Sequence, residues 1–231
     1  MKLKNIHRAI IALALPLCGL GGLTSCSDFL SIEPQNEIVL DNYWTEEKDV
    51  VSTLNSCYAH LESQNCINRM IVWGELRSDN MTTGSGAYNN IQQIVKENIL
   101  ETNDYTNWQS FYEVINLCNT VLHYAPGVNA IDPNFTDSEL SATLAEATTL
   151  RALSYFYLIR TFRNVPYVTQ PSIDDSQNYR VKATPFAQVL DSLIADVEAV
   201  KEDAVRSYGE ESVENTCRIT RWAWYSLLAD L

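Results

Sequence analysis

Aromatic rings and planar polar side chains are concentrated between residues 71 and 105. Proteins bind sugars through flat aromatic rings that cover the apolar faces of pyranoses, and through amide, carboxylate or guanidinium groups that bond the hydroxyls. This stretch supplies both kinds of side chain in Trp73, Arg77, Asp79, Asn80, Tyr88, Asn89, Asn90 and Tyr105. The predicted ligand contacts are Arg77, Asp79, Tyr88 and Asn89. The alternative is that Arg77 and Asp79 only fix the loop, by a salt bridge or a turn.

The sequence lacks the patterns that would indicate catalysis or a bound metal. Carboxylates are plentiful, but no pair is singled out for glycoside cleavage, which needs two carboxylates at a defined separation. No histidine and cysteine have the spacing of a zinc site. The run from Asp132 to Thr136 resembles a calcium loop only faintly, because the loop's glycine and distal glutamate are missing. We therefore predict no enzyme, no metal and no cofactor.

A lipoprotein signal is predicted at residues 1–25. Residues 1–8 form a basic segment and residues 9–17 an apolar one, which Pro16 and the following glycines interrupt before it reaches the length of a membrane span. The segment ends in Leu-Thr-Ser-Cys, which looks like a bacterial lipobox with Cys26 as the acylated residue. Two or three acyl chains would hold the protein on a membrane. The alternative is an uncleaved membrane anchor.

The charge of the chain restricts its partners. The formal net charge is −13, and removing the signal leaves 13 basic and 29 acidic residues, a charge of −16. Such a surface repels phosphate backbones, so nucleic acid is not an expected partner. Neutral ligands such as sugars or peptides are compatible with it. The composition, 46% hydrophobic and 19% charged, is that of a globular protein.

Hydrophobic periodicity predicts an all-α domain over residues 45–231, preceded by an extended tether at 26–44. Helices are expected to begin near residues 45, 107, 137, 185 and 220. Thr45 is the expected N-cap of the first, Pro126-Gly127 should end the second, Thr136 and Glu139 form a capping box for the third, and Thr184-Pro185 should start the fourth. Residues 71–105 are the long irregular insertion between the first two, and within it residues 91–99 could form a short helix or strand. Paired helices with short loops predict stacked hairpins resembling tetratricopeptide repeats, although the spacing is too uneven for a regular repeat.

Two further expectations concern the end of the chain and its cysteines. The apolar pattern of residues 220–231 stops without a capping signal, so we expect the chain to be a portion of a longer protein. Cys57, Cys66, Cys118 and Cys217 could pair as disulfides in an exported protein, but Cys57 and Cys118 lie on apolar helix faces, which favours buried thiols.

The tryptophans of the helical segments are expected to be core residues. Each lies on or beside an apolar stripe, where burial is commoner than service as a sugar platform. The residues are Trp44, Trp108, Trp222 and Trp224.

Four segments resemble the SusD/RagB nutrient-uptake family, in matching order and spacing across essentially the whole chain. They are Ser25–Pro34, with a Leu-x-x-x-Pro after the cysteine; Tyr43–Glu47 with Tyr58; Trp108, Tyr112, Ile115-Asn116 and Asn119; and Glu146-Ala147, Leu150–Ala152 and Tyr155–Leu158 with Val165-Pro166. One departure is Arg163, where the family most often has glycine. Arginine at positive φ costs about 1 kcal/mol, so either Asn164 adopts that conformation or the turn differs.

The resemblance implies a truncated all-α SusD-like fold on the outer face of the outer membrane. It implies a surface lipoprotein that captures oligosaccharides, or in some members peptides, and hands them to a TonB-dependent SusC-like transporter. It also implies that ligand contacts come from the amino-terminal insertion and from a carboxy-terminal half that this chain lacks. The alternative function is a helical scaffold that mainly docks the transporter.

Overall fold

The computed structural model describes residues 43–78, 80–173, 177 and 179–231. Residues Trp44–Leu231 form one compact unit. The predicted signal, Cys26 and the tether up to residue 42 lie outside the described residues, and so does Asp79.

The described chain is mostly helical, which confirms the all-α prediction. Its elements in order are α3 (Glu47–Leu61), α4 (Gln64–Ile71), the π-helix η2 (Val72–Leu76), α5 (Asn89–Val95), the 3₁₀-helix η3 (Asp104–Thr106), α6 (Gln109–Asn129), α7 (Asp137–Phe162), β1 (Val165–Pro166), β2 (Ala183–Thr184), α8 (Phe186–Ala199), α9 (Glu214–Cys217) and α10 (Arg221–Asp230). The insertion expected from residue 71 is thus partly helical, and α5 overlaps residues 91–99, for which a short helix or strand was expected.

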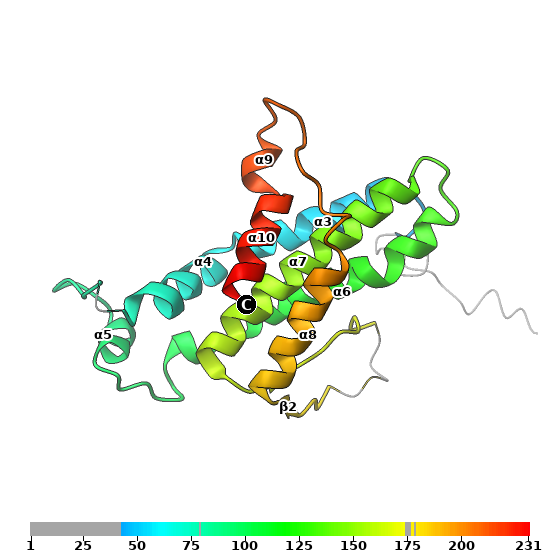
Figure 1. Ribbon diagram of the computed structural model, residues 1–231. Helices are drawn as coiled ribbons and strands as arrows, with labels where there is room; N and C mark the ends of the chain where they lie inside the picture. The colour runs from blue at the N-terminus through cyan, green and yellow to red at the C-terminus, as the bar shows by residue number, and fades with distance from the viewer. Residues whose placement is uncertain (1–42, 79, 174–176, 178) are drawn as a thin grey trace, which may run out of the picture. The chain divides into compact units, whose positions relative to one another are not determined.

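Helix α7 is the centre of the core. It packs against α6 on one side and α8 on another, while α3 packs against α6 (Figure 1). Small residues alternate with large ones on α7, and Ala147, Leu150 and Tyr155 are fully buried. The capping box predicted for this helix is present, with the Glu139 backbone N–H donating to Thr136 Oγ1 over 3.3 Å.

The predicted end of α6 at Pro126-Gly127 is wrong, because the helix continues to Asn129. Proline removes one helical hydrogen bond and usually kinks or ends a helix. Here Ala125 and Val128, on either side of the pair, are buried in the core. Tertiary packing therefore outweighs the local preference.

The start of α3 is fixed by a side chain from a distant loop. Asp132 accepts a hydrogen bond from the Glu47 N–H over 2.8 Å and another from the Asn134 N–H over 2.9 Å. The segment that faintly resembles a calcium loop therefore uses its aspartate as a helix cap. The N-cap itself is Glu46, one residue after the predicted Thr45.

Replacing Asp132 with alanine is expected to lower the free energy of unfolding at neutral pH. Hydrogen bonds from the Glu47 and Asn134 backbones lower the pKa of this carboxyl group in the folded state. Its stabilisation is therefore present above the unfolded pKa of about 3.9 and lost as pH falls through the lower folded pKa. Urea denaturation should show a wild-type advantage at neutral pH that shrinks in acid. The exposed Asp203→Ala is the control, and an equal deficit in both variants would refute the capping role.

The turn after α7 corrects a second expectation. Arg163 itself, not Asn164, has positive φ, at 66° with ψ −83°. The Arg163 guanidinium lies 4.3 Å from the Phe186 ring centroid, and Asn164 Oδ1 accepts a hydrogen bond from the Phe186 N–H over 3.0 Å. These contacts stabilise the strained turn. They also place the N-cap of α8 at Pro185, one residue later than predicted.

The tryptophan and cysteine predictions are confirmed in part. Trp44 and Trp224 are buried, and Trp108 packs on Tyr112 and Phe162, but Trp222 is 72% exposed and its core assignment is wrong. The exposed and buried tryptophans of α10 are two positions apart, so they occupy different helix faces. The described cysteines are free thiols, of which Cys57, Cys66 and Cys118 are buried and Cys217 is exposed.

Candidate functional site

A polar hollow of about 320 Å³ opens where the insertion folds back on α4. We call it the insertion groove. Its lining residues are Asn65, Asn68, Arg69, Tyr88, Asn90, Asp104 and Tyr105. Amide, carboxylate and guanidinium groups thus surround two aromatic rings, which is the mixture expected for a saccharide site.

Arg69 positions the wall of the insertion groove that η3 forms. Its guanidinium donates to the backbone carbonyls of Asn65 at 3.0 Å, Asp104 at 2.8 Å and Asn107 at 2.6 Å. It also lies 5.9 Å from the Tyr105 ring centroid. One side chain of α4 therefore fixes the 3₁₀-helix η3, and with it the Tyr105 ring.

Further hydrogen bonds hold α5 and η3 together. Asn90 Nδ2 donates to Asp104 Oδ2 over 2.6 Å, and Asn103 Nδ2 donates to the Asn90 carbonyl over 2.9 Å. The Trp73 indole, in the π-helix η2, donates to the Tyr105 carbonyl over 2.9 Å. π-Helical segments occur frequently at functional sites. The groove is thus preorganised by the fold, which lowers the entropy cost of binding.

The four predicted contact residues have different positions. Tyr88 is the N-cap of α5, lines the insertion groove and is 83% exposed. Asn89 follows it at the surface and accepts a hydrogen bond from Gln93. Arg77 is exposed at the end of η2 and does not line the groove, and Asp79 lies outside the described residues.

Sequence analysis missed the contribution of α4 to this groove. Asn65, Asn68 and Arg69 are three and four positions apart, which places them on one face of a helix. Recognising residues 64–71 as helical would have revealed that face. The length of the insertion does not by itself indicate where it folds back.

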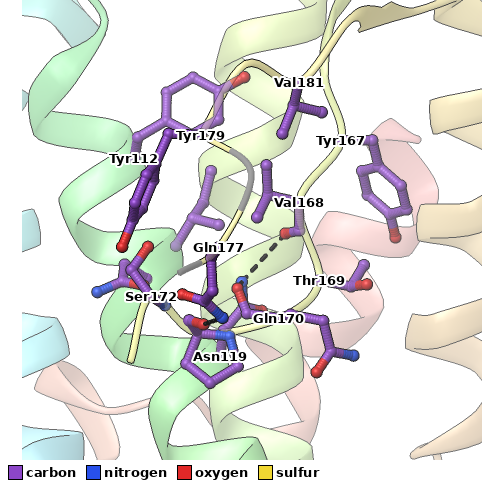
Figure 2. Close-up of a pocket in the computed structure, with 13 residues that line it drawn as sticks. Tyr112, Asn119, Tyr167, Val168, Thr169, Gln170, Ser172, Gln177, Tyr179 and Val181 are labelled. Carbon is purple, nitrogen blue, oxygen red and sulfur yellow. Dashed lines mark hydrogen bonds between the residues drawn. The ribbon is translucent and has the colours of Figure 1, made fainter. Parts of the chain in front are cut away.

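A second hollow, of about 420 Å³, lies between α6 and the loop that joins β1 to β2. We call it the tyrosine cavity (Figure 2). Three tyrosines line it, with Tyr167 on the side opposite Tyr112 and Tyr179 in Figure 2. The other lining residues are Ile115, Asn116, Asn119, Val168, Thr169, Gln170, Pro171, Ser172, Gln177 and Val181.

Side chains of α6 and α7 hold the loop over this cavity. Asn119 Nδ2 donates to the Val168 carbonyl over 3.0 Å, and Asn116 Oδ1 accepts from the Ser172 N–H over 2.7 Å. Tyr155 donates to the Val168 carbonyl and accepts from the N–H of the same residue. The rim at Val168 and Ser172 is therefore held to the helices by these hydrogen bonds.

Among the described residues that line the tyrosine cavity, none is Asp, Glu, Lys or Arg. Burial raises the pKa of the Tyr112 phenol, and burial with the nearby Asp196 carboxylate raises that of Tyr167 to about 12. Both phenols are therefore neutral at physiological pH.

Within the part of the chain that the structure describes, no group of three or more His, Cys, Asp or Glu side chains is placed to hold a metal ion. The same described residues form no helix that has both the length and the apolarity needed to cross a membrane.

Comparison with known proteins identifies relatives of the same fold. A family model described as "Starch-binding associating with outer membrane" matches residues 28–231. The SusD-like protein P38 of Formosa agariphila is 26% identical over 87% of this chain and 38% of its own length, and P2 of the same organism is 24% identical with the same coverage. The chain thus spans about two fifths of the length of these curated relatives.

Solved structures agree with this assignment. A SusD superfamily protein from Bacteroides thetaiotaomicron has 25% identity and a TM-score of 0.70, covering 80% of this chain and 43% of its own. A laminarin-binding SusD-like protein shares the fold at 22% identity, with a TM-score of 0.66 and coverage of 80% of this chain and 39% of its own. The chain belongs to the SusD-like family.

Proposed function

We propose that this protein captures oligosaccharides at the cell surface and passes them to a SusC-like TonB-dependent transporter. In this proposal Cys26 carries the acyl chains that anchor it to the outer face of the outer membrane. The outer-membrane and starch-binding description of the matching family supports the proposal, as do solved relatives named for binding laminarin and surface glycans. The insertion groove is the observation that carries it.

The chemistry of the insertion groove fits a sugar better than a charged ligand. Tyr88 presents an exposed ring that can cover a pyranose face. Asn65 and Asn68 offer amides that both donate and accept, matching sugar hydroxyls. The described lining has one positive side chain, Arg69, and one negative side chain, Asp104, so it offers little net charge to an ion.

Tyr88→Ala is expected to weaken glycan binding about tenfold, which corresponds to about 1.4 kcal/mol. The ring is exposed, so its removal should not affect folding. Arg77→Ala is the matched control, because Arg77 lies outside the groove lining, and its affinity should equal that of the wild type. Calorimetric titration with the glycan that binds best measures both.

Other affinities of these variants would change the proposed site or the proposed function. Loss of affinity in Arg77→Ala alone would move the ligand to the end of η2. Unchanged affinity in Tyr88→Ala and Asn89→Ala, with an intact transporter complex, would favour the scaffold function.

The anchor and the partner need separate tests. Intact-mass spectrometry of the membrane-extracted protein should show Cys26 as an acylated first residue, and an unmodified thiol there would refute the anchor.

Affinity purification from outer membranes should recover a TonB-dependent transporter, and its absence would refute the partnership.

A further inference from the structure

We infer that the saccharide bound in the insertion groove is a chain of two or more units, and that its next unit lies in a third hollow beside the groove. The inference rests on the proposed function. This hollow of about 110 Å³, which we call the α6 hollow, is lined by Asn65, Arg69, Asn107, Gln109, Ser110 and Glu113. These residues belong to α4, to the segment before α6 and to its first turns, and every residue of 64–71 and 104–113 is described.

The α6 hollow adjoins the insertion groove, because the two share two residues of α4. Asn65 and Arg69 line both hollows and are one helical turn apart, on the same face of the helix. The Arg69 guanidinium donates to the carbonyl of Asp104, which lines the groove, and to that of Asn107, which lines the α6 hollow. The Asn65 side-chain amide bonds to no other described residue, so it is available to a ligand that passes from one hollow to the other.

Three side chains at the start of α6 each have one polar atom bound and another unused. Asn107 Oδ1 accepts from the Gln109 N–H over 2.8 Å, and its NH₂ group bonds to no other described residue. Gln109 Nε2 donates to Glu113 Oε1 over 2.8 Å, which leaves Gln109 Oε1 and Glu113 Oε2 without a donor among the described residues. The bound atoms orient these side chains before a ligand arrives. The unused atoms provide a donor group and two acceptors, which match sugar hydroxyls that both donate and accept.

The two hollows differ in a way that suits consecutive units of one chain. The insertion groove has the rings of Tyr88 and Tyr105, and its volume of about 320 Å³ is at the lower end of the range for ligand pockets. The described lining of the α6 hollow has no aromatic ring. One unit can therefore stack on Tyr88 by its ring face, while the next is bound through its hydroxyls. The link to the stacked unit raises the effective concentration of the next unit at the α6 hollow, so a free monosaccharide should not occupy it.

Side-chain amide signals in ¹⁵N NMR spectra can follow both hollows in one titration. Asn90 reports on the insertion groove and Gln109 on the α6 hollow. The probes are glucose, maltotriose, laminaritriose and a capped trialanine peptide, because the family description names starch and a solved relative is named for laminarin. We expect glucose to shift the Asn90 signal alone. At least one trisaccharide should shift both signals with one shared midpoint, at an affinity about tenfold above that of glucose.

Glu113→Ala tests the α6 hollow without changing the groove. Glu113 is exposed and does not line the groove, so its removal should not affect folding. The variant should bind the trisaccharide about fivefold more weakly and glucose as the wild type does. Asp191→Ala, which removes an exposed carboxylate from α8, is the matched control and should change neither affinity. Tyr88→Ala should weaken the binding of both sugars, because both stack on that ring.

Each other outcome overturns a specific part of this account. A trisaccharide that shifts Asn90 but not Gln109 would refute the second unit and leave the proposed function standing. Different midpoints at the two amides would refute a single chain across both hollows. Equal losses in Glu113→Ala and Asp191→Ala would refute the role of Glu113. Shifts with the peptide and with no sugar would refute the ligand class, and no shift with any probe would refute the inference together with the groove as a glucan site.

Discussion

Replacing Trp224 with alanine is expected to lower the free energy of unfolding by about 3–5 kcal/mol. Its side chain is 1% exposed, and the indole donates to the Val197 carbonyl of α8 over 2.8 Å. The substitution removes a large apolar volume and one of the hydrogen bonds to that carbonyl, which keeps the bond from the Val200 N–H. Urea denaturation monitored by circular dichroism measures the change.

Trp222 provides the matched control for this prediction. It lies on the same helix two positions earlier and is 72% exposed. Trp222→Ala should change the free energy of unfolding by no more than about 0.5 kcal/mol. Equal effects of the two substitutions would contradict the packing of α10 against α8.

Removal of the Glu146 carboxylate should be the other large effect on stability. Glu146 is 4% exposed and accepts two hydrogen bonds from Arg218, at 2.9 and 2.6 Å, and one from the Tyr58 hydroxyl. The Tyr58 hydroxyl in turn accepts from the Ile219 N–H over 2.9 Å. This cluster ties the segment before α10 to α3 and α7.

Glu146→Ala is expected to cost about 3 kcal/mol of stability, because it leaves Arg218 without its buried counter-charge. This value is at the low end of the usual cost of breaking a buried ion pair, because 24% of the Arg218 side chain remains exposed. Glu214 is the control, because it binds the same guanidinium at 3.0 Å from a position 45% exposed. Glu214→Ala should cost less than about 1 kcal/mol. A larger loss in Glu214→Ala than in Glu146→Ala would contradict the buried pair.

Local sequence signals were enough to predict the helices of the core. The capping box at Thr136 and Glu139 and the apolar spacing along α6 and α7 depend on residues a few positions apart, so one sequence contains them. The end of α6 could not be predicted from local signals, because it depends on the burial of Val128, and burial depends on distant elements. The positive φ of Arg163 could not be predicted either, because contacts with Phe186 stabilise that conformation.

The candidate sites were only partly predictable for the same reason. The residue type and the long insertion predict Tyr88 as a contact, and Tyr88 lines the insertion groove. The role of Arg69 rests on carbonyls 35 and 38 positions away. The tyrosine cavity joins Tyr112 to Tyr179, and no periodic pattern connects residues so far apart. Composition can thus indicate the kind of ligand, whereas the walls of a site come from tertiary contacts.

Glycan capture is tested most directly by calorimetric titration of the purified protein with neutral plant, host and microbial glycans, alongside a set of uncharged peptides. The account predicts saturable heat with at least one glycan, reduced by Tyr88→Ala and unaffected by Arg77→Ala. Heat from the peptides, together with none from any glycan, would contradict it.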